Sequence, residues 1–313
     1  MNFALSRGKI VILLHQNTKK LSILVFTFIL FLGAILAGML GSLTGLGGGV
    51  VIIPFLTLGF GVDIKYAVGT ALITSIATSS GAAAAYIKEG ITNIRIGMFL
   101  EIATTAGAVV GALIAVFLPG SIIYIILGIV LIFSAAMTVR KKNASINYNE
   151  GGSRLAQVLK LNSSYPAPGG VRQTYQVRNV AGGFSMMAIA GMLSGILGIG
   201  SGALKVLAMD AAMKIPFKVS TTTSNFMVGV TAAASAVIYF QRGQIQPVLA
   251  MPVVIGVLTG AFFGSKILIS INVSLLRKIL SIVIALLAIQ MIYRGLLMSF
   301  LTQWFPSVHF PNI

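Results

Sequence analysis

Long apolar stretches follow one another along the chain, separated by short polar or glycine-rich breaks. They lie at about 21–43, 50–60, 66–87, 97–118 and 121–139, and again at about 180–199, 203–213, 219–240, 247–269 and 275–298. A helix needs about 20 apolar residues to span a bilayer, so the second stretch of each half is too short. The pattern predicts an all-α polytopic membrane bundle, in which each half contains a Gly-rich broken or re-entrant helix.

Composition and charge narrow the class of protein further. Hydrophobic residues make up 57% of the chain and charged residues 9%, whereas soluble domains carry about 25% charged residues. The net charge of +17 does not indicate nucleic-acid binding, because the Lys and Arg residues lie between the apolar stretches, as they do in membrane proteins. The chain has no Cys and only two His, near the termini, so we expect no metal site and no cofactor.

A basic polar segment divides the chain into two similar halves. We predict an N-terminal transmembrane repeat over 1–139, a flexible cytoplasmic linker over 140–178 and a C-terminal transmembrane repeat over 179–313. The sequence Gly-Met-Leu at 38–40 recurs at 191–193, an offset of 153 residues. The same offset relates several other glycines, which indicates the internal two-fold repeat common in secondary transporters.

The charges also suggest how the chain crosses the membrane. Residues 1–20 are basic, but the apolar stretch after them is too long for a signal peptide and lacks a clear cleavage site. With these residues inside and four full spans per half, the loop at Lys88 and Arg95, the linker and Arg242 all fall inside. This count favours parallel repeats. Five crossings per half would give inverted repeats and would place either the N-terminus or the linker outside.

Two glycine clusters are the most informative segments. Glycine costs about 1 kcal/mol relative to alanine in a helix, and backbone without partners is tolerated within a bilayer only where it is buried in protein or lines a cavity. A half-helix that follows such a break presents free N–H groups and the positive end of its dipole to an anion. The candidate ligands in these breaks are Gly45, Gly47, Gly48, Gly49, Gly198, Gly200, Ser201 and Gly202.

Other glycines have a simpler interpretation. Pairs of glycines spaced four residues apart permit close packing of helices. We favour this interpretation for Gly107 with Gly111 and for Gly260 with Gly264. The clusters are not phosphate-binding loops, since the Lys-Ser/Thr ending of a Walker motif is absent.

Polar residues in the spans add further candidates. Two hydroxyl clusters, which follow the glycine breaks, could bind an oxyanion: Thr70, Thr74, Ser75, Thr78 and Ser79, and residues 220–224 with Asn225. From these we choose Thr70, Thr74, Thr222 and Asn225, although Ser and Thr in spans often bond their own helix. Lys205 could attract the anion or extend to the membrane surface. Glu101 could take up a proton during transport, pair with Lys205, or lie at the interface.

One family shares these features. Gly-Leu-Gly-Gly-Gly at 45–49 with Pro54, its second copy after the linker, and the turns Tyr86 to Gly90 and Tyr239 to Gly243 resemble the TauE/SafE family of membrane proteins. The likeness covers about 38–115 and 191–268. It implies transport of small anions such as sulfite, sulfonates and sulfoacetate across prokaryotic inner membranes. The second copy departs from the pattern, because Ser201 replaces the middle glycine and Leu207 stands in place of Pro54.

The sequence therefore predicts a secondary transporter of a small anion in the cell inner membrane. It would work by alternating access, coupled to a proton or sodium gradient or driven by the substrate gradient alone, without a nucleic-acid partner. A passive anion channel is a close variant. An intramembrane enzyme is another alternative, because Ser201 and Lys205 are four residues apart and could act as nucleophile and base. A membrane scaffold is a third, but it would not require two matched glycine breaks.

Overall fold

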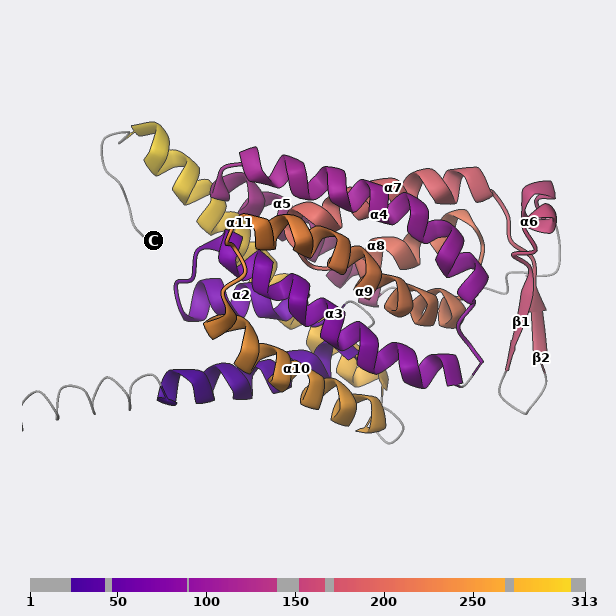
Figure 1. Ribbon diagram of the computed structural model, residues 1–313, viewed down its shortest axis with the longest axis horizontal. Helices are drawn as coiled ribbons and strands as arrows, with labels where there is room; N and C mark the ends of the chain where they lie inside the picture. Colours follow the sequence, from indigo (N-terminus) through magenta and orange to yellow (C-terminus); the bar gives the residue numbers. More distant parts are fainter. Residues whose placement is uncertain are drawn as a thin grey trace, which may run out of the picture.

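The computed structural model describes residues 24–42, 47–88, 90–139, 152–166, 172–267 and 273–304. Six of the described helices are long and apolar enough to cross a membrane, so the polytopic helical bundle is confirmed (Figure 1). The described helices of the bundle are the N-terminal helix (Leu24–Ser42), α2 (Gly49–Gly59), α3 (Ile64–Lys88), α4 (Ile94–Phe117), α5 (Gly120–Val139), α7 (Val180–Leu197), α8 (Gly202–Leu207), α9 (Phe217–Gln241), α10 (Pro247–Ile267) and α11 (Val273–Trp304).

The N-terminal helix and α2 form a re-entrant hairpin. The ring of Phe26, near the start of the hairpin, meets the ring of Phe60, just past its end, with centroids 5.1 Å apart. Halfway along, Gly33 faces Phe55. Gly47 has a φ of +82°, a conformation that glycine adopts without steric cost. The chain therefore turns at the glycine cluster and returns to the end of the bundle from which it came. This is the re-entrant alternative of the predicted broken or re-entrant helix.

A second re-entrant hairpin is formed by α7 and α8. Met213, beyond α8, accepts a hydrogen bond from the backbone N–H of Arg178, before α7, at 3.0 Å, and its side chain packs on Gly183. The turn between the helices has Gly198 and Ser201 in the left-handed region, with φ of 68° and 45°. Helix α8 continues as a π-helical turn, η1 (Ala208–Ala212), a feature that is frequent at functional sites.

Helices α3 and α9 cross antiparallel between the two hairpins. The backbone of Gln244, beyond the end of α9, lies against Gly69 near the start of α3, and Ser79 near the end of α3 bonds Asn225 in the first half of α9. The two helices begin 153 residues apart, at Ile64 and Phe217. Because segments related by the offset run in opposite directions, the parallel arrangement favoured from the charges is wrong. The repeat itself stays a prediction.

The error has a simple physical origin. The charge count treated the N-terminal helix as a full crossing, but α2 brings the chain back, so the hairpin contributes no net crossing. The same holds for α7 and α8. Among the described helices, α3, α4 and α5 of the first half and α9, α10 and α11 of the second then run between the two ends of the bundle, and the N-terminal helix begins at the end opposite to the linker module (Figure 1).

Glycines allow the hairpins to pack closely against the crossing helices. A Cβ atom added at Gly107 or Gly111 would collide with the backbone of α7, and one at Gly260 with the backbone of the N-terminal helix. At Gly264 it would lie 2.5 Å from the hydroxyl oxygen of Ser42. The helix-packing interpretation of these four glycines therefore agrees with the structure.

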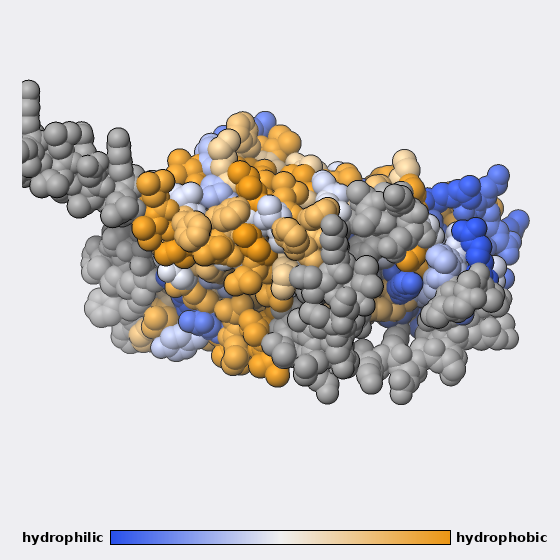
Figure 2. Space-filling model, turned by 90° about the horizontal axis from the view of Figure 1, so that it is seen from below, coloured by the Kyte–Doolittle hydropathy of each residue, from blue (hydrophilic) through white to orange (hydrophobic). Residues whose placement is uncertain are grey.

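Part of the predicted linker is folded. Residues 152–166 and 172–179, which we call the linker module, contain α6 (Arg154–Val158) and the antiparallel strands β1 (Ser163–Pro166) and β2 (Arg172–Tyr175). The prediction of a wholly flexible segment is therefore wrong for these residues. The rest of 140–178 lies outside the described residues. Figure 2 shows hydrophilic side chains gathered at the end that carries this module and mostly apolar ones over the bundle.

Cysteine labelling tests the direction of the second half. The chain has no native Cys, so single substitutions report unambiguously. We expect Gln246→Cys, after α9, to react from the same side of the membrane as Asp63→Cys, before α3, and from the side opposite to Gln157→Cys in α6. Reaction of positions 246 and 157 from one side would contradict the antiparallel arrangement.

Candidate functional site

The tips of the two re-entrant hairpins meet at the centre of the bundle. A Cβ atom added at Gly49 would lie 3.1 Å from the carbonyl oxygen of Gly198, and one at Gly47 would lie 3.8 Å from that of Ile199. Val228 of α9 packs against both Gly47 and Gly200. The structure therefore brings together the candidate glycines Gly47, Gly48, Gly49, Gly198, Gly200 and Gly202, whereas Gly45 lies outside the described residues.

Helix α3 places two hydroxyl groups on the first tip. A Cβ atom added at Gly48 would lie 2.9 Å from Oγ1 of Thr78, and one at Gly49 would lie 2.9 Å from Oγ of Ser75. Ser75 is fully buried, and its hydroxyl has no hydrogen-bond partner among the described residues. Ser75 belonged to the hydroxyl cluster predicted from the sequence but was not one of the residues chosen from it as ligands. Because a buried unpaired hydroxyl is costly, it is a good candidate to bind a ligand.

Three of the predicted threonines bond within their own helices. Thr70 donates to the carbonyl of Tyr66 at 2.9 Å, and Thr74 donates to that of Ala71 at 2.8 Å. Thr222 donates to the carbonyl of Lys218 at 3.1 Å. These hydrogen bonds follow the alternative interpretation given above, so the hydroxyls of these residues are weaker candidates than that of Ser75.

Asn225 lies where the backbone of α9 contacts α3. Its side-chain amide nitrogen is buried and has no partner among the described residues. Ser79 of α3 donates to the carbonyl of Asn225 at 2.5 Å and accepts from the N–H of Gly229 at 3.0 Å. In a regular helix that N–H and that carbonyl would bond each other. The hydroxyl of Ser79 therefore bridges a carbonyl and an N–H that lie one turn apart in α9, and ties the backbone of that helix to α3.

A buried polar network joins three helices beside the second tip. Lys205 of α8 is 0% exposed, and its Nζ donates to Oγ1 of Thr231 in α9 at 2.5 Å. The hydroxyl of Thr231 in turn donates to Oε1 of Glu101 in α4 at 2.6 Å. Thr105 donates to the same oxygen at 3.0 Å, while Oε2 of Glu101 has no partner among the described residues. The position of Lys205 excludes an ammonium group that extends to the membrane surface.

Lys205 and Glu101 are connected differently from the direct contact that was one of the predictions. The sequence offered a direct contact between Lys205 and Glu101 as one possibility, whereas in the structure the hydroxyl of Thr231 connects them. Thr231 was not among the predicted candidates. The signal that could have found it is its offset of 153 from Thr78, which lies on the first tip.

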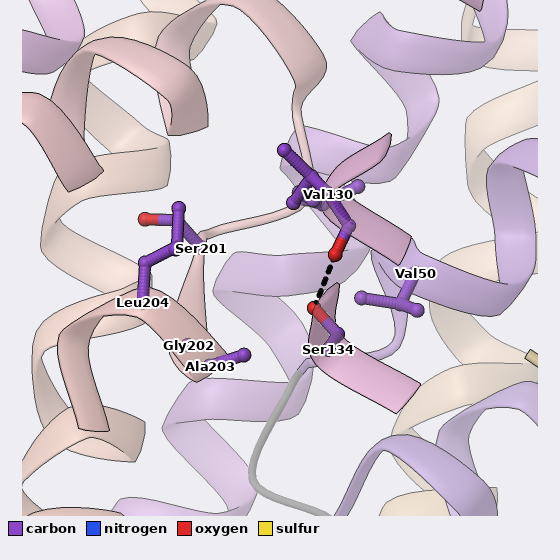
Figure 3. A pocket seen from close by; sticks show the side chains of 8 residues that line it. Val50, Val130, Ser134, Ser201, Gly202, Ala203 and Leu204 are labelled. Carbon is purple, nitrogen blue, oxygen red and sulfur yellow. Dashed lines mark hydrogen bonds between the residues drawn. The ribbon is translucent and has the colours of Figure 1, made fainter. Parts of the chain in front are cut away.

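A narrow crevice lies beside the tips, between α5 and α8. It is lined by Val50 of α2, by Val130 and Ser134 of α5, and by the segment 201–204 (Figure 3). Ser134 donates to the carbonyl of Val130 at 2.8 Å, and the hydroxyl of Ser201 points away from both. Residues 47–50 and 198–203 are all buried. A ligand could reach the tips only after the hairpins or α5 move.

Comparisons with known proteins agree with this architecture. The family model described as sulfite exporter TauE/SafE matches residues 30–291. The "probable membrane transporter protein YunE" of Bacillus subtilis is 30% identical over 283 residues, which cover 87% of this chain and 98% of the relative. YdhB of the same organism is 24% identical over 78% of this chain and 89% of its own length, and bears the same description. No solved structure matches the chain.

Proposed function

Because the chain belongs to the sulfite exporter TauE/SafE family, we propose that it is a secondary transporter that carries a small oxyanion, sulfonate or carboxylate across the cytoplasmic membrane of a prokaryote. It is a multi-pass membrane protein, and its curated relatives are described as probable membrane transporters. The observation that carries the proposal is the meeting of two glycine-rich tips, which belong to hairpins that begin at opposite ends of the bundle.

The tips offer neutral donors to an anion. Helix α2 begins at the first tip, and the residue at its N-cap position, Gly48, provides no side-chain cap. The first N–H groups of a helix have no partner within the helix, and the dipole favours negative charge there. The hydroxyl of Ser75 and the amide of Asn225 are buried donors without partners among the described residues. An anion bound between them would satisfy groups whose burial otherwise costs about 1–3 kcal/mol each.

The arrangement of the hairpins suits alternating access. Each tip is reached from a different end of the bundle, so displacement of one hairpin would open the site to one side only. Helices α3 and α9 lie against the two tips, and the hydroxyl of Ser79 in α3 bonds the backbone of α9, so movement of one helix would be felt by the other. Glu101 is our candidate for proton coupling, since its carboxylate is buried next to the second tip.

Charge indicates which end faces the cytoplasm. Cytoplasmic ends of membrane proteins are enriched in Lys and Arg. At the opposite end the basic residues with described side chains are Lys65, Arg242 and Arg294, whereas near the linker module they are Arg95, Arg154, Lys160, Arg172, Arg178, Lys214 and Lys218. We therefore place the linker module in the cytoplasm.

Flux measurements in proteoliposomes test the proposal. Candidate substrates are sulfite, sulfoacetate, taurine, sulfate and simple carboxylates, each measured with and without a pH gradient. We expect saturable uptake of one of them, accelerated by unlabelled substrate on the opposite side. Saturable flux without that acceleration would favour a channel, and absence of flux from folded protein would overturn the anion proposal.

Ser201→Gly separates a transporter from an enzyme. The Nζ of Lys205 donates to Thr231, and the hydroxyl of Ser201 has no hydrogen-bond partner among the described residues, so this serine and this lysine are not bonded to each other. Glycine is the residue found 153 positions earlier, at Gly48, and it suits the φ of 45° at this position. We expect the variant to retain its maximal transport rate, with at most about a tenfold rise in the substrate concentration at half-maximal rate. Complete loss of activity in well-folded protein would favour the enzyme.

A further inference from the structure

An open cavity lies between the start of α4 and the linker module. It has a volume of about 290 Å³, close to the lower end of the range for ligand pockets. The polar residues that line it are Thr92, Asn93, Arg95, Lys160, Asn162 and Ser163. None of them belongs to the hairpin tips, so the cavity is separate from the proposed transport site.

The charge of this cavity is positive. Arg95 of α4 and Lys160 of the linker module line it together, and no acidic residue lines it. The guanidinium of Arg95 donates to the backbone carbonyl of Lys160 at 3.4 Å, a long contact. Two cations that share a cavity repel each other and attract an anion.

Neutral donors accompany the two cations. The hydroxyl oxygen of Thr92 is buried and has no partner among the described residues. Asn162 accepts from the N–H of Val177 at 2.9 Å through Oδ1, so its amide NH₂ is the group that can donate into the cavity. Two cations, a hydroxyl and an amide form a donor set that matches a compact oxyanion with several acceptor oxygens.

We propose that this cavity binds an oxyanion of the sulfate or phosphate class, either free in solution or as the phosphate of a lipid headgroup. The anion would join Arg95 to Lys160 and thereby hold the linker module against α4. The site is on the water-facing end of the bundle, and its occupancy does not depend on the transport proposal.

Asn93 connects this cavity to the second hairpin. Its side-chain amide donates to the carbonyl of Leu161 at 3.1 Å and to the hydroxyl oxygen of Tyr175 at 2.7 Å, both in the linker module. Its backbone N–H donates to Oγ1 of Thr223 in α9 at 3.1 Å. The next residue, Ser224, donates to the carbonyl of Gly202 at the second tip, at 3.1 Å. An anion that fixes the linker module would therefore restrain that tip.

The contact between Asn93 and Tyr175 does not change over the physiological pH range. Burial raises the pKa of Tyr175 to about 12, so its hydroxyl stays protonated at neutral pH. This tyrosine therefore adds no pH dependence to binding in the cavity.

Thermal unfolding of the purified full-length protein tests the site. Sodium sulfate or phosphate is added in detergent, with sodium chloride adjusted to hold the ionic strength constant. We expect a saturable rise in Tm, and an apparent Kd at least tenfold higher in Arg95→Gln/Lys160→Asn. Asparagine is chosen at position 160 because it tolerates the φ of 52° found there. Both native side chains are exposed, so the variant should fold.

Two control variants test whether the anion-induced rise in Tm comes from binding in this cavity. Arg154→Gln/Arg172→Gln removes the same charge from exposed positions that do not line the cavity, and it should keep the full shift. Gly49→Ala, at the first hairpin tip, should also keep it, which separates this site from the transport site.

Measurements in nanodiscs distinguish a lipid phosphate from an oxyanion that is free in solution. A shift that requires phosphatidylglycerol and is lost in Arg95→Gln/Lys160→Asn would support the site and identify a lipid phosphate. Sulfate also stabilises proteins by exclusion from their surface, without saturation. A shift that rises linearly, a shift equal in the two-charge variant, or no shift with free anion or lipid would overturn the proposal.

Discussion

Gly49→Ala is expected to lower the transport rate by roughly tenfold or more, since overpacking a close contact costs about 1–3 kcal/mol. The added Cβ atom would lie 2.9 Å from Oγ of Ser75 and 3.1 Å from the carbonyl oxygen of Gly198. The hydroxyl of Ser75 can rotate away, but the carbonyl belongs to the backbone of the other tip. The methyl group would therefore separate the two tips where we place the anion.

Gly59→Ala is the matched control. It makes the same change in the same helix, at an exposed position where an added Cβ atom meets nothing within 4 Å. Alanine is also favoured over glycine in a helix by about 1 kcal/mol. Initial rates in proteoliposomes, divided by the amount of inserted protein, should therefore fall for Gly49→Ala and stay unchanged for Gly59→Ala. Equal rates in the two variants would show that contact between the tips is not needed for transport.

Lys205→Met should severely reduce the yield of folded protein. The substitution removes the ammonium group but leaves the carboxylate of Glu101 buried, and breaking a buried pair from one side costs about 3–5 kcal/mol. Methionine has a similar length and fits an apolar site, so lost packing contributes little. The measurement is thermal unfolding of protein purified in detergent, together with the fraction that elutes as a single species.

Glu101→Gln/Lys205→Met is the control for that prediction. The double variant has no buried charge in the network, and the hydroxyl of Thr231 can still donate to the amide oxygen at position 101. We expect it to recover most of the lost stability, but to transport without dependence on a pH gradient. If Lys205→Met alone were as stable as the native protein, the lysine and the carboxylate would not be coupled in the folded state.

Local patterns made a large part of the fold predictable. The glycine runs before Val50 and Ala203 break a helix whatever surrounds them, so the broken element of each half could be inferred from the sequence alone. Stretches of about 20 apolar residues likewise indicated the long helices. Close packing at Gly107 and Gly260 followed from spacing, because residues four apart lie on one face of a helix.

Other features depended on contacts that the sequence does not display. Whether the N-terminal helix crosses the membrane or returns through α2 is decided by packing such as that of Gly33 on Phe55, and this choice reverses the direction of everything that follows. Thr231 was missed because its partners lie 26 and 130 positions away. Ser75 could not be separated from Thr74, since only the structure shows which hydroxyl bonds its own helix.

The opposed directions of the two hairpins bear on the balance between the states of a transport cycle. If the two halves were identical, exchanging their conformations would convert the inward-open form into the outward-open form. The two forms would then have equal energies and equal populations. The network of Lys205, Thr231 and Glu101 removes that equality, because the residue 153 positions before Lys205 is the apolar Ile52. Among the described residues of the two tips, Lys205 of the second hairpin is the one buried charge. A difference of about 1.4 kcal/mol between the two forms would shift their ratio tenfold, so an asymmetry of that size would give the empty protein of the proposed cycle a preferred side.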